Sequence, residues 1–439
     1  MQYLLAAFFF LIYAGDTFGL AVGIAPGLSL KNLLLYLVLT GIFINTAVVR
    51  NRKLELTGVL VMFSLLIVYA LVTWIVLTFI ARDPDYLAKA AFIKLKSGLG
   101  DQLMTLLMFF YGCLALKDTK WLLRAIIWIA VIGNVVTVID TMNIPDLGIL
   151  PVPRKGGRFE GFLGQPNEYG QFLALFLPAF IVLFMESRKW QRWLAGLGLF
   201  ASAIALVLTG SRGAWVGVVG GAVLGCFYMR QYIPAQTVVR AVMGTVVVGS
   251  LVLVVTYLTG YADLYLSRFE GIGGTPHTAT AGRSSIWRNA IKYMLENPLS
   301  FITGYGFYAY ESSRNFRLST HNIYLWYLYN LGVIGLSLFV GVFARVLSTA
   351  RKALADAPPE QRPHIMGMLF GVLAFLVSSF FSDFHNVGYL LWAYIGIVMR
   401  IAMQLKSAVP EQAAAPAGEA PVPRPVPEWR PRGLGSASR

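Results

Sequence analysis

One histidine of the chain lies where it could handle protons. His321 follows a long polar segment, residues 259–320, and an apolar run from Ile323 to Phe343 begins directly after it. An ionisable side chain beside a run that enters lipid is costly to place, and imidazole exchanges protons near neutral pH. We therefore predict that His321 does chemistry close to a lipid-borne substrate. A helix cap or an interface residue is the alternative interpretation of a lone histidine.

Arg212 lies in the very short turn Thr209 to Ala214, between two apolar runs. With so little loop, its guanidinium must sit at the membrane boundary, where an unpaired charge costs a few kcal/mol. The position favours binding of an anion such as phosphate. The alternative is a side chain that extends to the lipid headgroups.

Arg283 and Arg288 lie in the polar segment, within a stretch that predicts an amphipathic helix. Apolar residues recur there at helical spacing: Ile286, Trp287, Ala290, Ile291 and Met294. Arg283 precedes the first turn, where the helix dipole also favours an anion, and Arg288 follows about one and a half turns later. A helix that only lies on the membrane surface is the alternative.

Two further cations could contact phosphate. Arg158 belongs to a glycine-rich stretch, residues 154–161, in which the backbone can approach a ligand closely. An ordinary turn before a helix is an equal alternative. Lys94, with Lys96, lies in the segment 81–100 before the fourth apolar run, and we predict one more phosphate contact from it.

The composition shows which elements must position these residues. Hydrophobic residues make up 57% of the 439 residues and charged residues only 13%, about half the charged content of soluble domains. The apolar runs are continuous and long enough to cross about 30 Å of hydrocarbon as helices. We predict an all-α polytopic membrane protein of twelve spans: 3–24, 28–48, 55–80, 101–116, 121–141, 169–186, 191–209, 212–229, 238–258, 321–345, 364–382 and 385–404.

The spans divide the chain into four parts. Residues 1–258 hold the first nine helices, 259–320 form one helical insert before the tenth span, and 321–406 hold the last three helices. Residues 407–439 are rich in alanine and proline and predict a disordered tail. The first run lacks a basic leader, so we expect it to be a retained helix.

The formal net charge of +15 divides between the two faces of the membrane. Lys and Arg gather in the short loops of one face, which predicts that this face and both termini are cytoplasmic. Most cations of the opposite face lie in three longer segments, 81–100, 142–168 and 259–320, and we expect an anionic ligand there. Nucleic acid is an unfavoured partner, because topology and anionic lipid explain the inner charges.

The sequence predicts neither a metal site nor a disulfide framework. The two cysteines, Cys113 and Cys226, both lie inside predicted spans. The four histidines are scattered and have no ligand spacing typical of a metal site. We expect no cofactor.

Four short motifs, all on the predicted outer face, carry a family resemblance. They are Ser-Arg-Gly at 211–213, Gly-Arg-Ser-Ser-Ile-Trp at 282–287, Gly-Tyr-Gly-Phe at 304–307, and His-Asn at 321–322 before an aromatic-rich helix. In this order they resemble the bacterial O-antigen ligase and polymerase superfamily, over roughly residues 155–345. The chain departs from the family pattern at Asn330, which lies near a position where members often have glutamate.

The resemblance implies an inner-membrane enzyme that transfers a glycan from undecaprenyl pyrophosphate to an acceptor hydroxyl in the periplasm, without metal or nucleotide. It places His321 at the family's essential histidine and Arg212 and Arg283 at its anion-binding arginines; Arg288 corresponds less closely. The residue types agree, since pyrophosphate needs neutralising and the hydroxyl needs a base.

We therefore expect an O-antigen ligase that uses lipid A-core as its acceptor. A polymerase of the repeat units and a ligase acting on protein hydroxyls are the nearest alternatives. A lipid-linked glycan transporter or flippase is a different class, which predicts charges buried in the middle of the spans.

Overall fold

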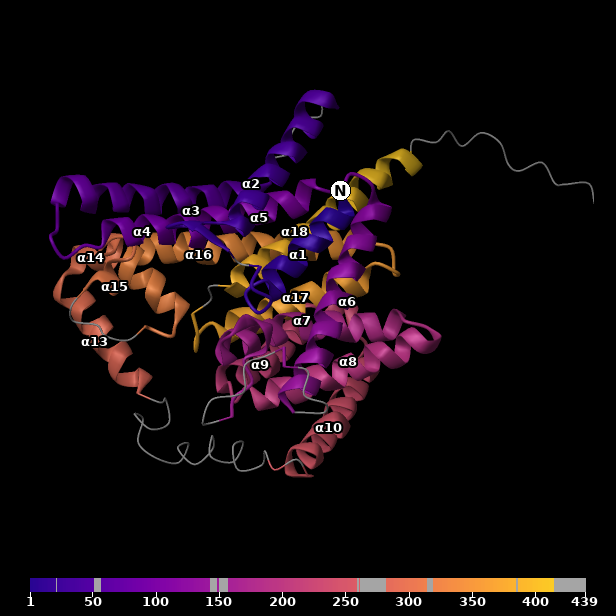
Figure 1. Cartoon of the computed structure of the whole chain (residues 1–439). Helices are drawn as coiled ribbons and strands as arrows, with labels where there is room; N and C mark the ends of the chain where they lie inside the picture. Colours follow the sequence, from indigo (N-terminus) through magenta and orange to yellow (C-terminus); the bar gives the residue numbers. More distant parts are fainter. Residues whose placement is uncertain are drawn as a thin grey trace, which may run out of the picture.

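The computed structural model is a bundle of helices (Figure 1). It describes residues 1–20, 22–50, 57–142, 148–149, 157–258, 260, 282–313, 319–383 and 386–413. Several features of the sequence lie outside these residues: 154–156 of the glycine-rich stretch, 261–281 and 314–318 of the insert, His277, His385, and 414–439 of the predicted tail.

The described helices confirm the all-α polytopic fold. Eight are long and apolar enough to cross a membrane, and three shorter apolar helices, α1, α9 and α17, accompany them. With the unbroken helical run of α4, η3 and α5, they correspond to the twelve predicted spans. The elements of the first half are α1 (Gln2–Ala14), α2 (Leu30–Phe43), η1 (Ile44–Val49), α3 (Gly58–Ile75), η2 (Val76–Ala81), α4 (Ala88–Leu95), η3 (Lys96–Gly100), α5 (Asp101–Tyr111), α6 (Leu116–Thr141), η4 (Gly161–Leu163), α7 (Pro166–Glu186) and α8 (Lys189–Leu208).

The second half continues with the helices that carry most of the predicted site. They are α9 (Arg212–Tyr228), η5 (Arg230–Tyr232), α10 (Ala235–Leu258), α13 (Arg283–Glu296), α14 (Pro298–Thr303), α15 (Ala309–Ser312), α16 (Ile323–Asp356), α17 (Arg362–Ser378) and α18 (Asn386–Ala413). Helix α18 continues to Ala413, past the predicted start of the tail at 407.

The first predicted span was too long. Helix α1 ends at Ala14, and Asp16 lies in the turn that follows, not inside a span. A small antiparallel hairpin comes next, with strands β1 (Gly23–Ala25) and β2 (Leu28–Ser29). Gly27, in the connection between them, has a φ of 78°, which favours glycine.

The fourth predicted span began too late. Helical structure starts at Ala88 rather than at 101, so Lys94 and Lys96 lie in a helix and not in an outer loop. The charged residues lowered the hydropathy of this stretch, but Lys96 forms an ion pair with Asp101 at 3.0 Å, which offsets the penalty.

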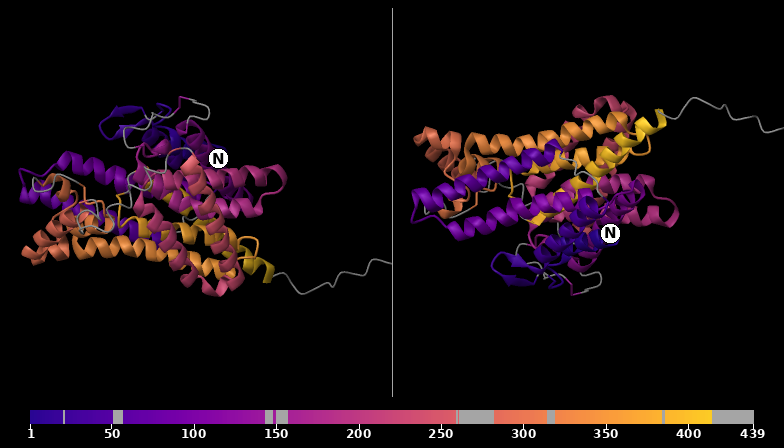
Figure 2. Two further views of the ribbon diagram at one scale, coloured as in Figure 1. Left: turned by 90° about the horizontal axis from the view of Figure 1, so that it is seen from below. Right: turned by 90° about the horizontal axis from the view of Figure 1, so that it is seen from above.

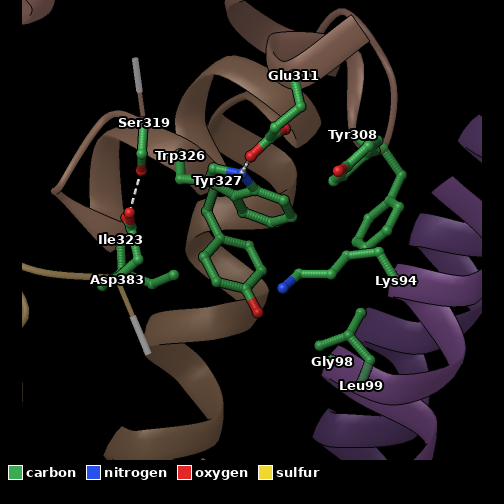
Figure 3. Close-up of a pocket in the computed structure, with 11 residues that line it drawn as sticks. Lys94, Gly98, Leu99, Tyr308, Glu311, Ser319, Ile323, Trp326, Tyr327 and Asp383 are labelled. Atoms are coloured by element: carbon green, nitrogen blue, oxygen red, sulfur yellow. Dashed lines mark hydrogen bonds between the residues drawn. The ribbon is translucent and has the colours of Figure 1, made fainter. Parts of the chain in front are cut away.

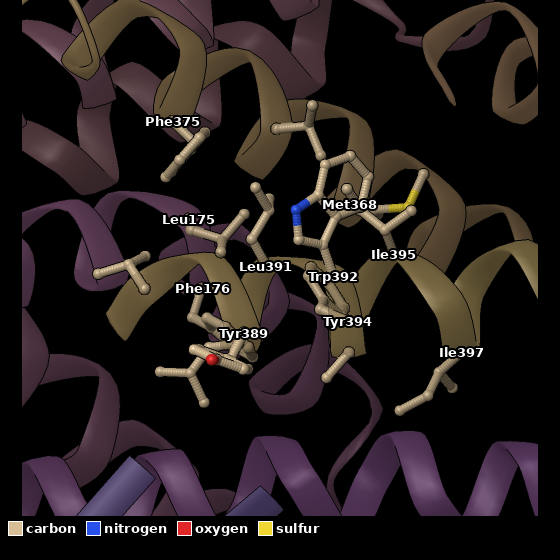
Figure 4. Close-up of a cluster of buried hydrophobic side chains, with 14 of the residues drawn as sticks. Leu175, Phe176, Met368, Phe375, Tyr389, Leu391, Trp392, Tyr394, Ile395 and Ile397 are labelled. Carbon is tan, nitrogen blue, oxygen red and sulfur yellow. The ribbon is translucent and has the colours of Figure 1, made fainter. Parts of the chain in front are cut away.

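Helix α18 lies at the centre of the bundle. It contacts α5, α6, α7, α16 and α17, and its buried side chains interleave with those of α7 and α17 (Figure 4). Helix α10, by contrast, packs mainly on α8 at the edge. Seen from above and below, the long helices run alongside one another (Figure 2).

Helix α9 packs against α17 through a stripe of glycines. A Cβ at any of these positions would lie 2.6 Å or less from an atom of α17 or of the turn that follows it; they are Gly213, Gly217, Gly221 and Gly225. Small residues four apart form one helix face, so the two backbones approach closely, as helices in membranes commonly do. This packing brings the start of α9 beside the end of α17.

The described part of the insert docks on α16. Helices α13, α14 and α15 lie at one end of the long pair α3 and α16 (Figure 1). Gly332 interrupts α16 with a φ of 64°, and a Cβ there would lie 2.2 Å from the Ile302 carbonyl oxygen. The Tyr305 and Gly306 amides donate to carbonyls of α16 just before this kink. The Gly-Tyr-Gly-Phe motif at 304–307 therefore joins the insert to α16.

Candidate active site

His321 lies in the short segment that leads into α16. Its φ of 46° is in the left-handed region, which residues other than glycine rarely adopt. Its amide donates to Ser319 Oγ at 3.3 Å, and Asn322 caps α16 by accepting a hydrogen bond from the Leu325 amide at 3.0 Å. These contacts hold the strained backbone and fix the imidazole at the start of the helix.

Asp383, from the turn between α17 and α18, lies beside His321. Its carboxylate accepts hydrogen bonds from the Ser319 hydroxyl and, at 3.3 Å, from the Thr320 hydroxyl. Its Oδ2 atom is 3.7 Å from Nδ1 of His321. The carboxylate is thus held by two hydroxyl groups and lies close to the imidazole.

Arg212 is the first residue of α9, and its neighbour Gly213 brings it toward the same turn. A Cβ on Gly213 would lie 2.5 Å from the Cβ of Phe381, two residues before Asp383. A larger side chain at 213 would push α9 away from this turn. The Ser-Arg-Gly motif therefore places a guanidinium next to the segment that holds Asp383.

Arg283 begins α13, on the insert. Trp287, one helical turn later, donates from Nε1 to the Thr320 carbonyl at 2.8 Å. Residues four apart share a helix face, so the face of α13 that carries Arg283 is directed toward the segment of His321. The insert helix and α9 approach the histidine from different parts of the chain.

The charges of these groups influence one another. Burial lowers the pKa of Arg283, the positive charge of Arg212 lowers it further, and Asp383 opposes both. Burial also lowers the pKa of His321, against the opposing charge of Asp383, and Arg283 lowers it further. The net lowering of this pKa favours the neutral imidazole, which is the form that can accept a proton.

Arg212 and Arg283 have no hydrogen-bond or ion-pair partner among the residues that the structure describes. Both side chains belong to half-buried residues. A guanidinium that loses water without gaining an anion is destabilising, so the pair favours a bound anion such as a diphosphate.

Arg158 makes contacts within the protein. Its Nε donates to the Thr209 carbonyl at 2.7 Å, and its terminal nitrogen donates to Asn167 Oδ1 at 2.8 Å. These bonds tie the start of α7 to the turn before Arg212. Contact between Arg158 and phosphate stays a prediction.

Arg288 and Lys94 lie apart from the two half-buried arginines. Arg288 is exposed, and five residues along a helix turn it about 140° away from Arg283. Lys94, in α4, interacts electrostatically with the carboxylates of Glu311, Asp383 and Glu168. Their contacts with phosphate also stay predictions.

A pocket of about 180 Å³ has Asp383 in its lining. Figure 3 shows Lys94 reaching into it from one wall, and Ser319 with Asp383 on the opposite wall. Glu311 and several aromatic rings complete the lining: Phe307, Tyr308, Trp326 and Tyr327. Neither Arg212 nor Arg283 lines it.

Among the described residues, no three His, Cys, Asp or Glu side chains group as ligands of a metal ion would. Both cysteines are free thiols outside this site. The groups gathered around His321 are guanidiniums, carboxylates, hydroxyls and aromatic rings.

Two acidic residues of the site were missed in the sequence. Asp383 lies between the predicted spans 364–382 and 385–404, which are separated by as few residues as the two spans around Arg212, so the boundary argument used for Arg212 would have found it. Glu311 had no such signal, because it belongs to the insert, where a charged residue is ordinary.

Asn330, the departure from the family pattern, has a structural role. It is fully buried, its Oδ1 accepts a hydrogen bond from the Tyr310 amide at 2.9 Å, and its Nδ2 donates to the Trp326 carbonyl at 2.9 Å. A carboxylate could not donate. Asn330 thereby fixes the short helix α15, which carries Glu311.

Comparison with known families gives one finding. Residues 197–340 match the family model described as O-antigen ligase. The match begins within α8 and ends within α16, so it contains Arg212, Arg283, Arg288 and His321 and leaves out Lys94, Arg158 and Asp383. No curated protein matches the chain.

Proposed function

We propose that this multi-pass membrane protein, whose residues 197–340 match the O-antigen ligase family, is a glycosyltransferase that moves a glycan from undecaprenyl pyrophosphate to a sugar hydroxyl of lipid A-core. The reaction takes place at the periplasmic face of the inner membrane, with both termini in the cytoplasm. The observation that carries the proposal is an imidazole 3.7 Å from a carboxylate that two hydroxyls hold, in a site that also gathers two guanidiniums without partners among the described residues.

In this reaction the acceptor hydroxyl forms a bond to the anomeric carbon of the donor glycan. His321 accepts the proton of that hydroxyl, and the bond between the anomeric carbon and the phosphate oxygen breaks. The electron pair leaves with undecaprenyl pyrophosphate. Arg212 and Arg283 neutralise the charge that grows on this leaving group.

Asp383 supports the base. Once His321 carries the proton, the carboxylate at 3.7 Å stabilises the imidazolium and keeps the ring oriented. The hydroxyls of Ser319 and Thr320 hold Asp383 in place, so little reorganisation is needed when the charge appears.

The remaining cations have smaller proposed roles. Arg158 positions the turn before Arg212 through its hydrogen bond to the Thr209 carbonyl. A phosphate within reach of its guanidinium would accept a further hydrogen bond from it. Arg288 adds positive charge at the exposed edge of the site, and Lys94 adds it in the pocket that Asp383 lines. No metal ion or other cofactor is needed, because two guanidiniums supply the charge neutralisation.

The test is a reaction with purified protein in detergent, supplied with the undecaprenyl pyrophosphate-linked glycan and lipid A-core. We expect a conjugate of the two to form without added divalent metal. A flippase would make no conjugate in detergent, since it needs a sealed bilayer. Replacing lipid A-core with unlinked repeat units or a hydroxyl-bearing peptide distinguishes a ligase from a polymerase and from a protein glycosyltransferase.

A further inference from the structure

The pocket beside Asp383 has the properties of a site for an uncharged polar ring. Four aromatic side chains line it, together with the carboxylates of Glu311 and Asp383 and the ammonium group of Lys94 (Figure 3). Aromatic walls with a few convergent polar groups are typical of small-molecule sites. Its volume of about 180 Å³ is below the usual range of about 300–1,000 Å³ for drug-sized ligands, so it suits one ring rather than an oligosaccharide.

Glu311 has one carboxylate oxygen in use and one without a partner. Its Oε1 accepts a hydrogen bond from Trp326 Nε1 at 2.6 Å. Its Oε2 is buried and has no hydrogen-bond partner within the described part of the chain. A buried acceptor left unpaired is destabilising, so the pocket lacks a hydrogen-bond donor at this point. A sugar hydroxyl would supply one.

The charges of the pocket separate the two substrates. The two carboxylates of Glu311 and Asp383 outnumber the single ammonium group of Lys94 in the pocket and would repel a diphosphate, whereas Arg212 and Arg283, which attract one, do not line it. The donor's pyrophosphate therefore belongs with the two arginines, outside this pocket. The pocket is left for the second substrate.

We propose that this pocket binds a single sugar ring of the acceptor, with Glu311 Oε2 accepting hydrogen bonds from its hydroxyls and the aromatic rings enclosing its faces. The reacting hydroxyl of the ring then lies at the Asp383 edge, next to His321. This inference rests on the proposed function and assigns Glu311 a part in selecting the acceptor. This binding role adds no covalent step to the transfer reaction.

The experiment that tests this acceptor pocket compares Glu311→Gln with Glu296→Gln. Glutamine keeps an oxygen to accept from Trp326 but removes the charge. Glu296 is a matched control, because it lies on the same insert, is 56% exposed, forms an ion pair with Lys292 at 3.9 Å and does not line the pocket. In the detergent assay we expect Glu311→Gln to raise KM for the acceptor about tenfold or more, with KM for the donor unchanged, and Glu296→Gln to match the wild type.

A binding measurement separates recognition from turnover. Core oligosaccharide released from lipid A, without donor, should bind the wild type and Glu296→Gln equally and Glu311→Gln about tenfold more weakly. Equal binding by all three proteins would overturn the pocket assignment, and so would a loss of kcat at unchanged acceptor KM. If Glu311→Gln cannot be recovered folded, Tyr308→Ala removes one wall and leaves the bond to Trp326 intact. The same rise is expected, and no rise would overturn the inference.

Failure of the inference and failure of the proposed function are distinguishable. If the wild type forms no conjugate with any acceptor, the proposed function is wrong. If the wild type forms conjugate and the Glu311 variants keep the acceptor KM of the control, only the pocket assignment is wrong.

Discussion

The two arginines and the two carboxylates near His321, which we call the arginine side and the carboxylate side of the site, differ in how their charges are held. On one side, Arg212 and Arg283 are half buried and have no partner among the described residues. On the other, Asp383 is held by two hydroxyls and Glu311 by an indole nitrogen. Guanidiniums without a partner need a ligand anion, whereas the carboxylates are positioned before any ligand arrives. The arginine side should therefore govern use of the donor, and the carboxylate side should govern the acceptor and the proton.

The histidine between the two sides should show the largest effect. We expect His321→Ala to lower kcat about a thousandfold, since general base catalysis contributes about 10²–10⁴, with KM for both substrates changed little. The measurement is conjugate formation at saturating donor and acceptor. His364→Ala is the control: His364 contacts Glu186 at 3.0 Å at the other end of α17, and its loss should leave the rate near that of the wild type. Substantial transfer by His321→Ala would remove it from the role of base.

The arginine side comes second. Arg212→Ala should raise KM for the donor about a hundredfold, because a charge-assisted hydrogen bond contributes about 1.5–3 kcal/mol. Arg212→Lys should restore only part of this loss, because the two-pronged guanidinium geometry is missing. KM for the acceptor should not move.

The control for this prediction is Arg188→Ala, which removes an exposed arginine from the loop between α7 and α8. Donor kinetics in Arg212→Ala equal to those of this control would mean that Arg212 contacts lipid headgroups. They would also remove the difference between the two sides.

The sequence predicts the arginine side better than the carboxylate side, for a physical reason. A charge between two apolar runs is costly, so Arg212 and His321 stand out by position alone. Glu311 is an ordinary residue in a polar segment, and its burial depends on the docking of α15 by Asn330, a contact across 20 residues. Asp383 could have been found by the same rule as Arg212.

The fold, like the site, was predictable from the sequence only in part. The twelve apolar runs predict twelve helical segments because hydrocarbon thickness sets their length. The start of the fourth helix at Ala88 was not predictable from hydropathy, because Lys96 and Asp101 neutralise each other only once the helix has formed. The glycines four apart in α9 indicate a close contact with another helix, but the sequence does not identify α17 as that helix.

Asp383 provides the third test, through pH. The neutral imidazole is the active form, so the rate should fall as pH drops through the pKa of His321, which burial and Arg283 lower. Asp383 acts in the opposite direction, so Asp383→Asn should lower this pKa further and move the acid limb of kcat/KM to lower pH. Its maximal rate should fall about tenfold, because the imidazolium loses a stabilising charge.

The pH profile of Asp383→Asn separates an electrostatic role from a structural one. A loss of rate with an unmoved acid limb would mean that Asp383 only holds the segment of Ser319 and Thr320. A shift to higher pH would contradict the proposed direction of its effect on His321.

The smallest effect is expected within the arginine side itself. Arg283 and Arg288 share helix α13, but only Arg283 is half buried and coupled electrostatically to Arg212. Arg288→Ala should therefore change donor KM by about fivefold at most, since an exposed charge contributes about 1 kcal/mol or less, and added salt should abolish the change. Arg283→Ala should approach the loss seen for Arg212→Ala and persist in salt. Equal losses for the two residues of α13 would show that proximity to the membrane surface, and not burial beside His321, decides which cations bind the pyrophosphate.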